Sequence, residues 1–222
     1  MNTARVKGSA LAALIAVVAW VAILLQLYLS LRYTAAGGKS VGEALVNYFG
    51  FFTVLTNLLV CLATTLPRVA PASMLGRFFV RPVAIGWVTA SIAFVGIAYY
   101  LLLRHVWAPQ GLQLVADVLL HYVVPILFVV YSLITLRGTA LRWTAPLWWC
   151  LYLVAYFVYV LVRGAIIGTY PYGFIDASKL GYVLTLRNGC LLLVAFLVLA
   201  YLLLLVWRVG AARVNPPDKT LL

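Results

Sequence analysis

Six long apolar stretches dominate this sequence and restrict its fold more than any other feature. We place them at residues 9–32, 43–66, 82–104, 112–136, 143–167 and 182–207. Each is long enough to cross a hydrocarbon core about 30 Å thick, which takes about 20 helical residues at a rise of about 1.5 Å each. The pattern therefore predicts six membrane crossings.

The stretches predict helices rather than strands. Lipid offers no hydrogen-bond partners, so a spanning segment must satisfy its backbone groups as a helix or within a closed barrel. The apolar runs are continuous and lack the strict alternation of barrel strands. Charged residues make up only 9% of the chain, against about 25% in soluble domains. We therefore expect an all-α polytopic membrane protein, a bundle of six transmembrane helices forming a single domain over residues 1–222.

Positive charges near the ends of the stretches predict the orientation of the bundle. Of the 16 Lys and Arg residues, ten lie on the side that includes both termini and six on the other side. The ten are Arg5, Lys7, Arg68, Arg77, Arg81, Arg137, Arg142, Arg208, Arg213 and Lys219. Cytoplasmic loops carry an excess of Lys and Arg. We expect both termini in the cytoplasm, with residues 208–222 as a cytoplasmic tail.

The formal net charge of +12 does not predict nucleic-acid binding. The basic residues are scattered over loops beside the membrane, where anionic lipid headgroups attract them. We expect membrane lipid and no nucleic acid as the partner. Cys61, Cys150 and Cys190 lie within apolar stretches, without a CxxC motif or a His/Cys ligand spacing. We expect them to be packing residues, with no cofactor and no metal.

Ionisable residues inside a span are rare because each costs about 2.5 to 3.5 kcal/mol on insertion scales. The fourth stretch contains two of them, Asp117 and His121. A spacing of four residues places both side chains on one helix face within pairing distance. Pro125 lies one turn further along and removes a backbone donor, so we expect a kink there.

Polar side chains also form stripes in other stretches. The second stretch contains Asn47, Gly50, Thr53, Thr56 and Asn57, the fifth contains Tyr152, Tyr156, Tyr159 and Arg163, and the sixth begins with Arg187 and Asn188. With the predicted orientation, Thr53 and His121 both lie roughly 14 Å below the outer ends of their helices. We expect this polar cluster to converge in the outer half of the bundle.

Packing roles compete with a functional role for each of these side chains. A membrane-helix threonine commonly bonds the carbonyl four residues earlier, and an Asp117 pair with Arg163 or Arg187 would join two helices. Tyrosine stripes often pack with satisfied hydroxyls. Aromatic residues near stretch ends, including Tyr99 and Tyr100, fit interfacial anchors.

Three motifs resemble the bacterial six-helix branch of the androgen-induced protein family over most of the chain. They are Tyr48-Phe-Gly-Phe-Phe-Thr53-Val-Leu-Thr-Asn57, His121-Tyr-Val-Val-Pro125, and Tyr170-Pro-Tyr-Gly-Phe-Ile-Asp176 with Gly181-Tyr182. Eukaryotic relatives are intramembrane threonine hydrolases that cleave fatty acid esters of hydroxy fatty acids. The resemblance implies a bacterial inner membrane, a nucleophile at Thr53 and a base at His121. In the relatives the Asn follows the nucleophile by three residues, whereas Asn57 follows Thr53 by four. Thr56 therefore remains an alternative nucleophile.

The chemistry of such a site needs several groups. A threonine hydroxyl needs a base to take its proton, and His121 at matching depth fits that role. Asp117 would fix the imidazole tautomer and stabilise its cation. The oxyanion of the intermediate needs donors, for which the candidates are Asn57, Tyr159, Arg187 and Asn188. Arg163 or Arg187 would meet a carboxylate headgroup of the lipid ester.

Two other function classes remain open. A small transporter or channel would use Asp117, His121 and the arginines as an ion path, although the halves of the chain show no evident repeat of the kind common in transporters. A structural or regulatory membrane protein would use the same polar groups for packing alone.

Overall fold

The computed structural model describes the backbone of residues 3–214 and the side chains of residues 10–209. In this part all regular secondary structure is helical, short loops join the helices, and there is no strand. Its elements are α1 (Thr3–Ala36), α2 (Val41–Tyr48), α3 (Phe52–Val69), α4 (Met74–Phe79), α5 (Pro82–Ala98), η1 (Tyr99–Leu103), α6 (Gly111–Val118), η2 (Leu119–Val123), α7 (Val124–Thr135), α8 (Ala145–Ile167), η3 (Gly173–Ile175) and α9 (Ala177–Val214). The side chains of Arg5, Lys7, Arg213 and Lys219 lie outside the described residues.

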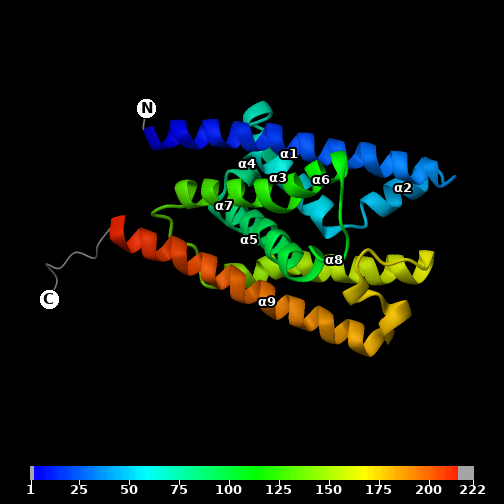
Figure 1. Cartoon of the computed structure of the whole chain (residues 1–222). Helices are drawn as coiled ribbons and strands as arrows, with labels where there is room; N and C mark the ends of the chain where they lie inside the picture. Colours follow the sequence, from blue (N-terminus) through cyan, green and yellow to red (C-terminus); the bar gives the residue numbers. More distant parts are fainter. Residues whose placement is uncertain (1–2, 215–222) are drawn as a thin grey trace, which may run out of the picture.

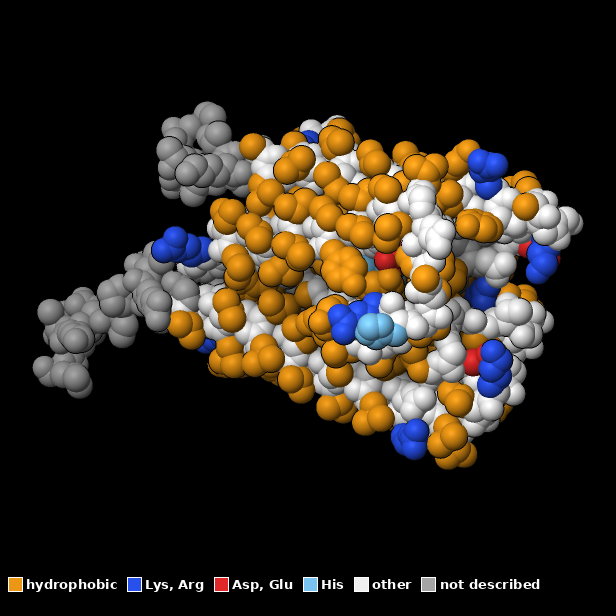
Figure 2. All heavy atoms as spheres, in the orientation of Figure 1, with side chains coloured by type: hydrophobic (Ala, Val, Ile, Leu, Met, Phe, Trp, Pro, Cys, Tyr) orange, Lys and Arg blue, Asp and Glu red, His pale blue; other side chains and the backbone are white. Residues whose placement is uncertain are grey.

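Six helical segments are long and apolar enough to cross a membrane, so the predicted all-α bundle is confirmed. They are Ala10–Ala36, Phe52–Val69, Pro82–Leu103, Gly111–Thr135, Ala145–Ile167 and Ala177–Val209. The start of α1 and the end of α9 lie at the same end of the bundle (Figure 1). On the face shown in Figure 2, hydrophobic side chains cover most of the middle, and most Lys and Arg side chains lie toward the two ends. The chain is an integral membrane protein.

The second predicted helix, residues 43–66, is broken in the structure. α2 begins with a capping box formed by Ser40 and Glu43 and ends at Tyr48, and α3 begins at Phe52. The prediction of one continuous polar stripe along this helix was therefore wrong. The break leaves carbonyl groups without helical partners, and a membrane tolerates such groups only where neighbouring side chains bond them. Donors from α8 do so, as described below.

Other helix boundaries also differ from the predicted ones. α1 runs to Ala36 rather than residue 32. α9 begins at Ala177 and contains a non-helical residue, Gly181, with φ 73° and ψ 159°. Glycine adopts this left-handed backbone without strain. α9 continues to Val214, so the first part of the predicted tail extends the helix.

Two π-helical turns interrupt the third and fourth spans. η1 continues α5, and η2 joins α6 to α7 immediately before Pro125. The irregularity expected at Pro125 takes this form, since proline cannot donate to the carbonyl of His121 four residues earlier. Gly96 lets α5 pass close to η2, because a Cβ there would lie 3.1 Å from the His121 carbonyl oxygen. Both π-turns thus lie at one helix crossing.

The most buried spans, α3 and α5, occupy the centre of the bundle. α1 packs against α3 and α7 on one side, while α8 and α9 pair on the other. The core includes Val60, Val88, Phe128 and Phe196, each fully removed from solvent. The beginning of α3, the end of α5 and the junction of α6 with η2 all lie toward the end of the bundle that is remote from the chain ends (Figure 1).

Candidate functional site

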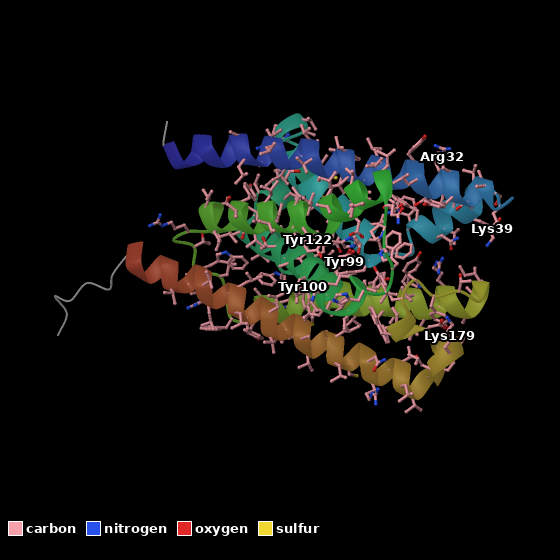
Figure 3. All side chains as sticks on the ribbon, viewed as in Figure 1. Arg32, Lys39, Tyr99, Tyr100, Tyr122 and Lys179 are labelled. Atoms are coloured by element: carbon pink, nitrogen blue, oxygen red, sulfur yellow. The ribbon has the colours of Figure 1, made fainter. Side chains whose placement is uncertain are left out.

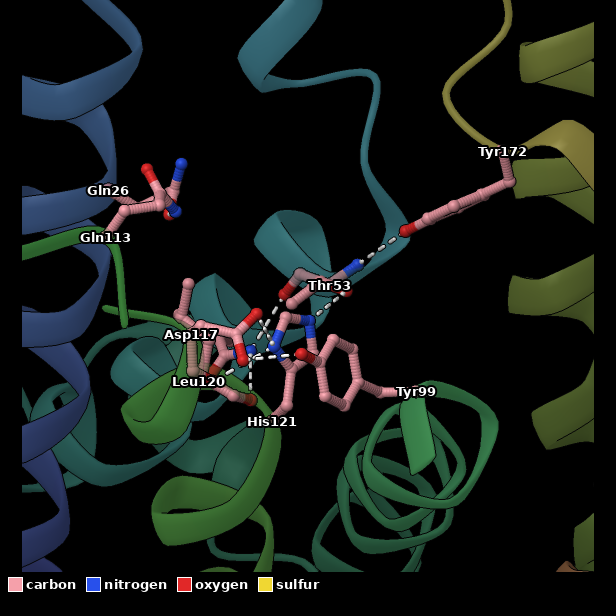
Figure 4. A network of polar contacts seen from close by, with 9 residues as sticks. Gln26, Thr53, Tyr99, Gln113, Asp117, Leu120, His121 and Tyr172 are labelled. Carbon is pink, nitrogen blue, oxygen red and sulfur yellow. Dashed lines mark hydrogen bonds and ion pairs between the residues drawn. The ribbon is translucent and has the colours of Figure 1, made fainter. Parts of the chain in front are cut away.

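Thr53 and His121 meet inside the bundle. Thr53 is the second residue of α3, and its Oγ1 lies 3.3 Å from Nε2 of His121 on η2. Both side chains are largely shielded, with 9% of Thr53 and 13% of the His121 side chain exposed. Figure 4 shows the two side chains pointing toward one another. A nucleophile and base within hydrogen-bond reach are the first geometric requirement for covalent catalysis.

Asp117 determines which nitrogen of the neutral His121 ring carries the hydrogen. The Nδ1 of His121 lies 3.0 Å from the main-chain carbonyl of Asp117 and 3.2 Å from its carboxylate Oδ1. Both atoms are acceptors, so Nδ1 carries the hydrogen and Nε2 presents its lone pair to the Thr53 hydroxyl. The hydrogen bond itself goes to the carbonyl, and the carboxylate lies close enough to stabilise an imidazolium.

Tyr99 was expected to be an interfacial anchor, and the structure places it in the site instead. Its side chain is 5% exposed, and its hydroxyl donates to Asp117 Oδ2 at 2.5 Å. Its ring stacks on the His121 ring with centroids 3.8 Å apart. Figure 3 labels Tyr99 over the middle of the bundle, away from its two ends. An aromatic residue near a helix end gives no sequence signal for this role. The neighbouring Tyr100 is 47% exposed.

Asn57 fixes the two helices that carry Thr53 and His121 relative to one another. Its amide nitrogen donates to the Thr53 carbonyl at 2.9 Å and to the Leu120 carbonyl at 3.2 Å. Because both amide hydrogens are used, Asn57 is not free to bind an oxyanion as predicted. Within the described residues its Oδ1 is buried without a hydrogen-bond partner.

The polar stripe of the fifth apolar stretch lies on α8, where its side chains support the helix break that precedes Thr53. The hydroxyl of Tyr156 donates to the Gly50 carbonyl at 2.9 Å, and that of Tyr159 to the Phe49 carbonyl at 3.4 Å. Arg163 donates to the Val46 carbonyl, the Thr169 carbonyl and the Asn47 side chain. Tyr159 is therefore not an oxyanion donor, and Arg163 does not pair with Asp117. These residues position the beginning of α3.

Three other predicted site residues lie elsewhere. Thr56 Oγ1 contacts the Tyr152 hydroxyl at 3.1 Å rather than the histidine. Arg187 contacts the Asn188 side chain, and Asn188 donates to the Phe174 carbonyl. The described residues that line the cavities at Thr53 include none of the three.

Tyr172 covers the beginning of α3 from the segment between α8 and α9. Its hydroxyl oxygen accepts a hydrogen bond from the Thr53 N–H at 3.4 Å (Figure 4). The first N–H groups of a helix have no intrahelical acceptor and carry the positive end of the helix dipole. Removal from water raises the pKa of Tyr172, so the hydroxyl keeps its proton at neutral pH. The sequence motif contains Tyr172, but the spacing alone did not connect it to Thr53.

Two cavities meet at Thr53. Cavity 1 has a volume of about 220 Å³ and runs between α5, α8 and α9 to Cys190. Cavity 2 has a volume of about 320 Å³ and extends along α1 and α6 past His121. Thr53, Tyr99 and Tyr172 line both cavities. A molecule that spans the two would therefore present its middle to Thr53.

Together, the fold and this site define a six-helix integral membrane protein with a shielded Thr–His–Asp arrangement between two cavities. Within the described residues, no group of three or more His, Cys, Asp or Glu side chains forms a candidate metal site. Comparisons with models of known protein families, with characterised proteins and with solved structures find no match.

Proposed function

We propose that this protein is an intramembrane hydrolase of lipid esters, with Thr53 as nucleophile and His121 as general base. The observation that carries the proposal is the 3.3 Å approach of Thr53 Oγ1 to Nε2 of a histidine whose Nδ1 faces Asp117. This chain of three groups is the arrangement that activates a hydroxyl in acyl transfer. The family resemblance of the three motifs supports the same assignment.

The reaction divides into two acyl transfers. Thr53 Oγ1 attacks the ester carbonyl carbon while His121 Nε2 takes the hydroxyl proton. The tetrahedral intermediate collapses, the bond to the alcohol oxygen breaks, and Nε2 returns the proton to that oxygen. Water then attacks the acyl-threonine with Nε2 as base, which releases the fatty acid and restores the hydroxyl.

The Thr53 N–H and the Tyr172 hydroxyl are the donors proposed for the oxyanion. They now bond one another across 3.4 Å. A carbonyl oxygen inserted between them would accept from both, and the start of α3 adds a favourable dipole. This pair replaces the donors predicted from sequence.

The surroundings favour a lipid as the source of the ester. The site lies within helices that fit a bilayer, and cavity 1 is lined almost entirely by apolar side chains such as Phe94, Leu153 and Leu193. An acyl chain fits such a lining. Esters of hydroxy fatty acids, the substrates implied by the resemblance, are one kind of long-chain ester and belong in the panel that tests the proposal.

The test is hydrolysis by purified protein in lipid nanodiscs, measured as fatty acid released from a panel of long-chain esters that includes esters of hydroxy fatty acids. We expect Thr53→Ala and His121→Ala each to lower turnover by a factor on the order of 10³ or more. Thr56→Ala is the matched control and should keep turnover, since Thr56 bonds Tyr152 instead. Full turnover by both Thr53→Ala and His121→Ala would overturn the mechanism.

A second measurement separates this hydrolase from a membrane protein without catalysis. A hydroxyl-reactive fluorophosphonate probe should label wild-type protein and Thr56→Ala but not Thr53→Ala. Equal labelling of all three proteins would show that the reactive hydroxyl is not that of Thr53.

A further inference from the structure

Cavity 2 differs from cavity 1 in having a polar wall. Gln26 and Ser30 of α1 and Gln113 of α6 line it together, on the side away from cavity 1. Gln113 is 8% exposed. Burying uncharged amides inside a membrane bundle is costly unless they find partners. The polar groups of this wall therefore need hydrogen-bond partners, from one another or from a molecule in the cavity.

The three side chains form a hydrogen-bonded row. Gln113 Nε2 donates to Gln26 Oε1 at 2.9 Å, and Gln26 Nε2 donates to Ser30 Oγ at 3.4 Å. Each amide nitrogen has a second hydrogen, and no described residue bonds Gln113 Oε1. The row thus offers both donors and acceptors to whatever fills the cavity. A hydroxyl group matches it, because a hydroxyl donates and accepts.

The charges around cavity 2 favour an uncharged occupant. None of the described residues that line it is Lys or Arg, whereas the Asp117 carboxylate is among them. Arg163, which could have met a carboxylate, is bonded to the carbonyls of Val46 and Thr169 instead. A carboxylate placed in this cavity would lose hydration and face a like charge without a cation.

We infer that cavity 2 binds the alcohol part of the substrate and selects an uncharged, hydroxyl-bearing alcohol, as in an acylglycerol, while cavity 1 holds the acyl chain. This inference rests on the proposed ester hydrolysis. Gln113, Gln26 and Ser30 are its specificity-determining residues, and none of them takes part in the chemical step.

The experiment compares three oleoyl esters of similar size with the full-length protein in nanodiscs. Their alcohols are glycerol, propanol and 3-hydroxypropanoate, so they differ in hydroxyl groups and charge. We expect kcat/KM for the glycerol ester to exceed that for the propyl ester about tenfold, as expected for one or two net hydrogen bonds. The carboxylate ester should be the poorest substrate.

Variants test whether the polar wall causes this preference. Gln113→Leu should lower the ratio of the glycerol to the propyl ester toward one, chiefly through KM for the glycerol ester. Ser30→Ala, a smaller change at the other end of the row, should lower the ratio in the same direction. Gln110→Leu is the matched control, since Gln110 is exposed three residues from Gln113 and lines neither cavity.

The outcomes separate the inference from the proposed function. If Thr53-dependent hydrolysis occurs but the carboxylate or propyl ester is preferred, the inference is wrong and the hydrolase stands. An unchanged ratio in both Gln113→Leu and Ser30→Ala would likewise overturn it. Absence of hydrolysis of every ester would overturn the hydrolase, and the inference with it.

Discussion

Tyr172 is the residue whose role is most sharply testable. Its hydroxyl faces the Thr53 N–H, and the proposed mechanism uses both as oxyanion donors. Tyr172→Phe removes one donor and keeps the ring, so we expect kcat to fall about 10² to 10³-fold with little change in KM. Steady-state hydrolysis measures this. Tyr170→Phe is the control, because the Tyr170 ring packs on Gly164 and lines neither cavity. An unchanged kcat in Tyr172→Phe would remove Tyr172 from the mechanism.

Some site residues are predictable from the sequence and others are not, for a physical reason. Asp117 and His121 lie four residues apart on one face, a relation that helical periodicity predicts directly. Tyr99 and Tyr172 come from other parts of the chain, so their contacts depend on which helices become neighbours. Thr53 was matched to His121 by depth along a helix that proved to be broken, and the two side chains nevertheless meet.

At the scale of elements, the break between α2 and α3 is what gives Thr53 its surroundings. Because α3 begins at Phe52, the Thr53 N–H has no helical acceptor and faces Tyr172. The six spans were predictable from hydropathy, but this break was not, because residues 43–66 are apolar enough for one helix. What stabilises the break lies on α8, whose donors bond the freed carbonyls.

Substitution of Gly50 tests whether the break between α2 and α3 requires close packing against Arg163 of α8. A Cβ at Gly50 would lie 3.0 Å from the Asn47 carbonyl oxygen and 3.1 Å from Arg163 Cζ. Gly50→Ala would push Arg163 away from its acceptors, so we expect destabilisation of about 1 to 3 kcal/mol and reduced hydrolysis. Gly42→Ala in α2 is the matched control, since its Cβ would meet only Ser40 Oγ at 3.7 Å. Thermal unfolding in detergent measures both, and equal melting temperatures would show that the break tolerates a side chain.

At the scale of the whole molecule, the bundle has two unlike ends. The beginning of α1 and the end of α9 share one end, and Arg208 of α9 bonds the Leu141 carbonyl between α7 and α8 there. Arg32, Lys39 and Lys179 lie toward the other end (Figure 3). The site is nearer that second end, so orientation decides which leaflet supplies its lipid.

The excess of Lys and Arg predicts the first end in the cytoplasm and the site in the outer half of the membrane. Cysteine labelling in intact cells tests this after Cys61, Cys150 and Cys190 are replaced by Ala. A membrane-impermeant maleimide should label Lys39→Cys in intact cells, because the segment between α1 and α2 would face outward. It should label Ala140→Cys, at an exposed position between α7 and α8, only after permeabilisation. The reverse pattern would show that the bundle has the opposite orientation and that the inner leaflet supplies the substrate. The distances within the site do not depend on the orientation.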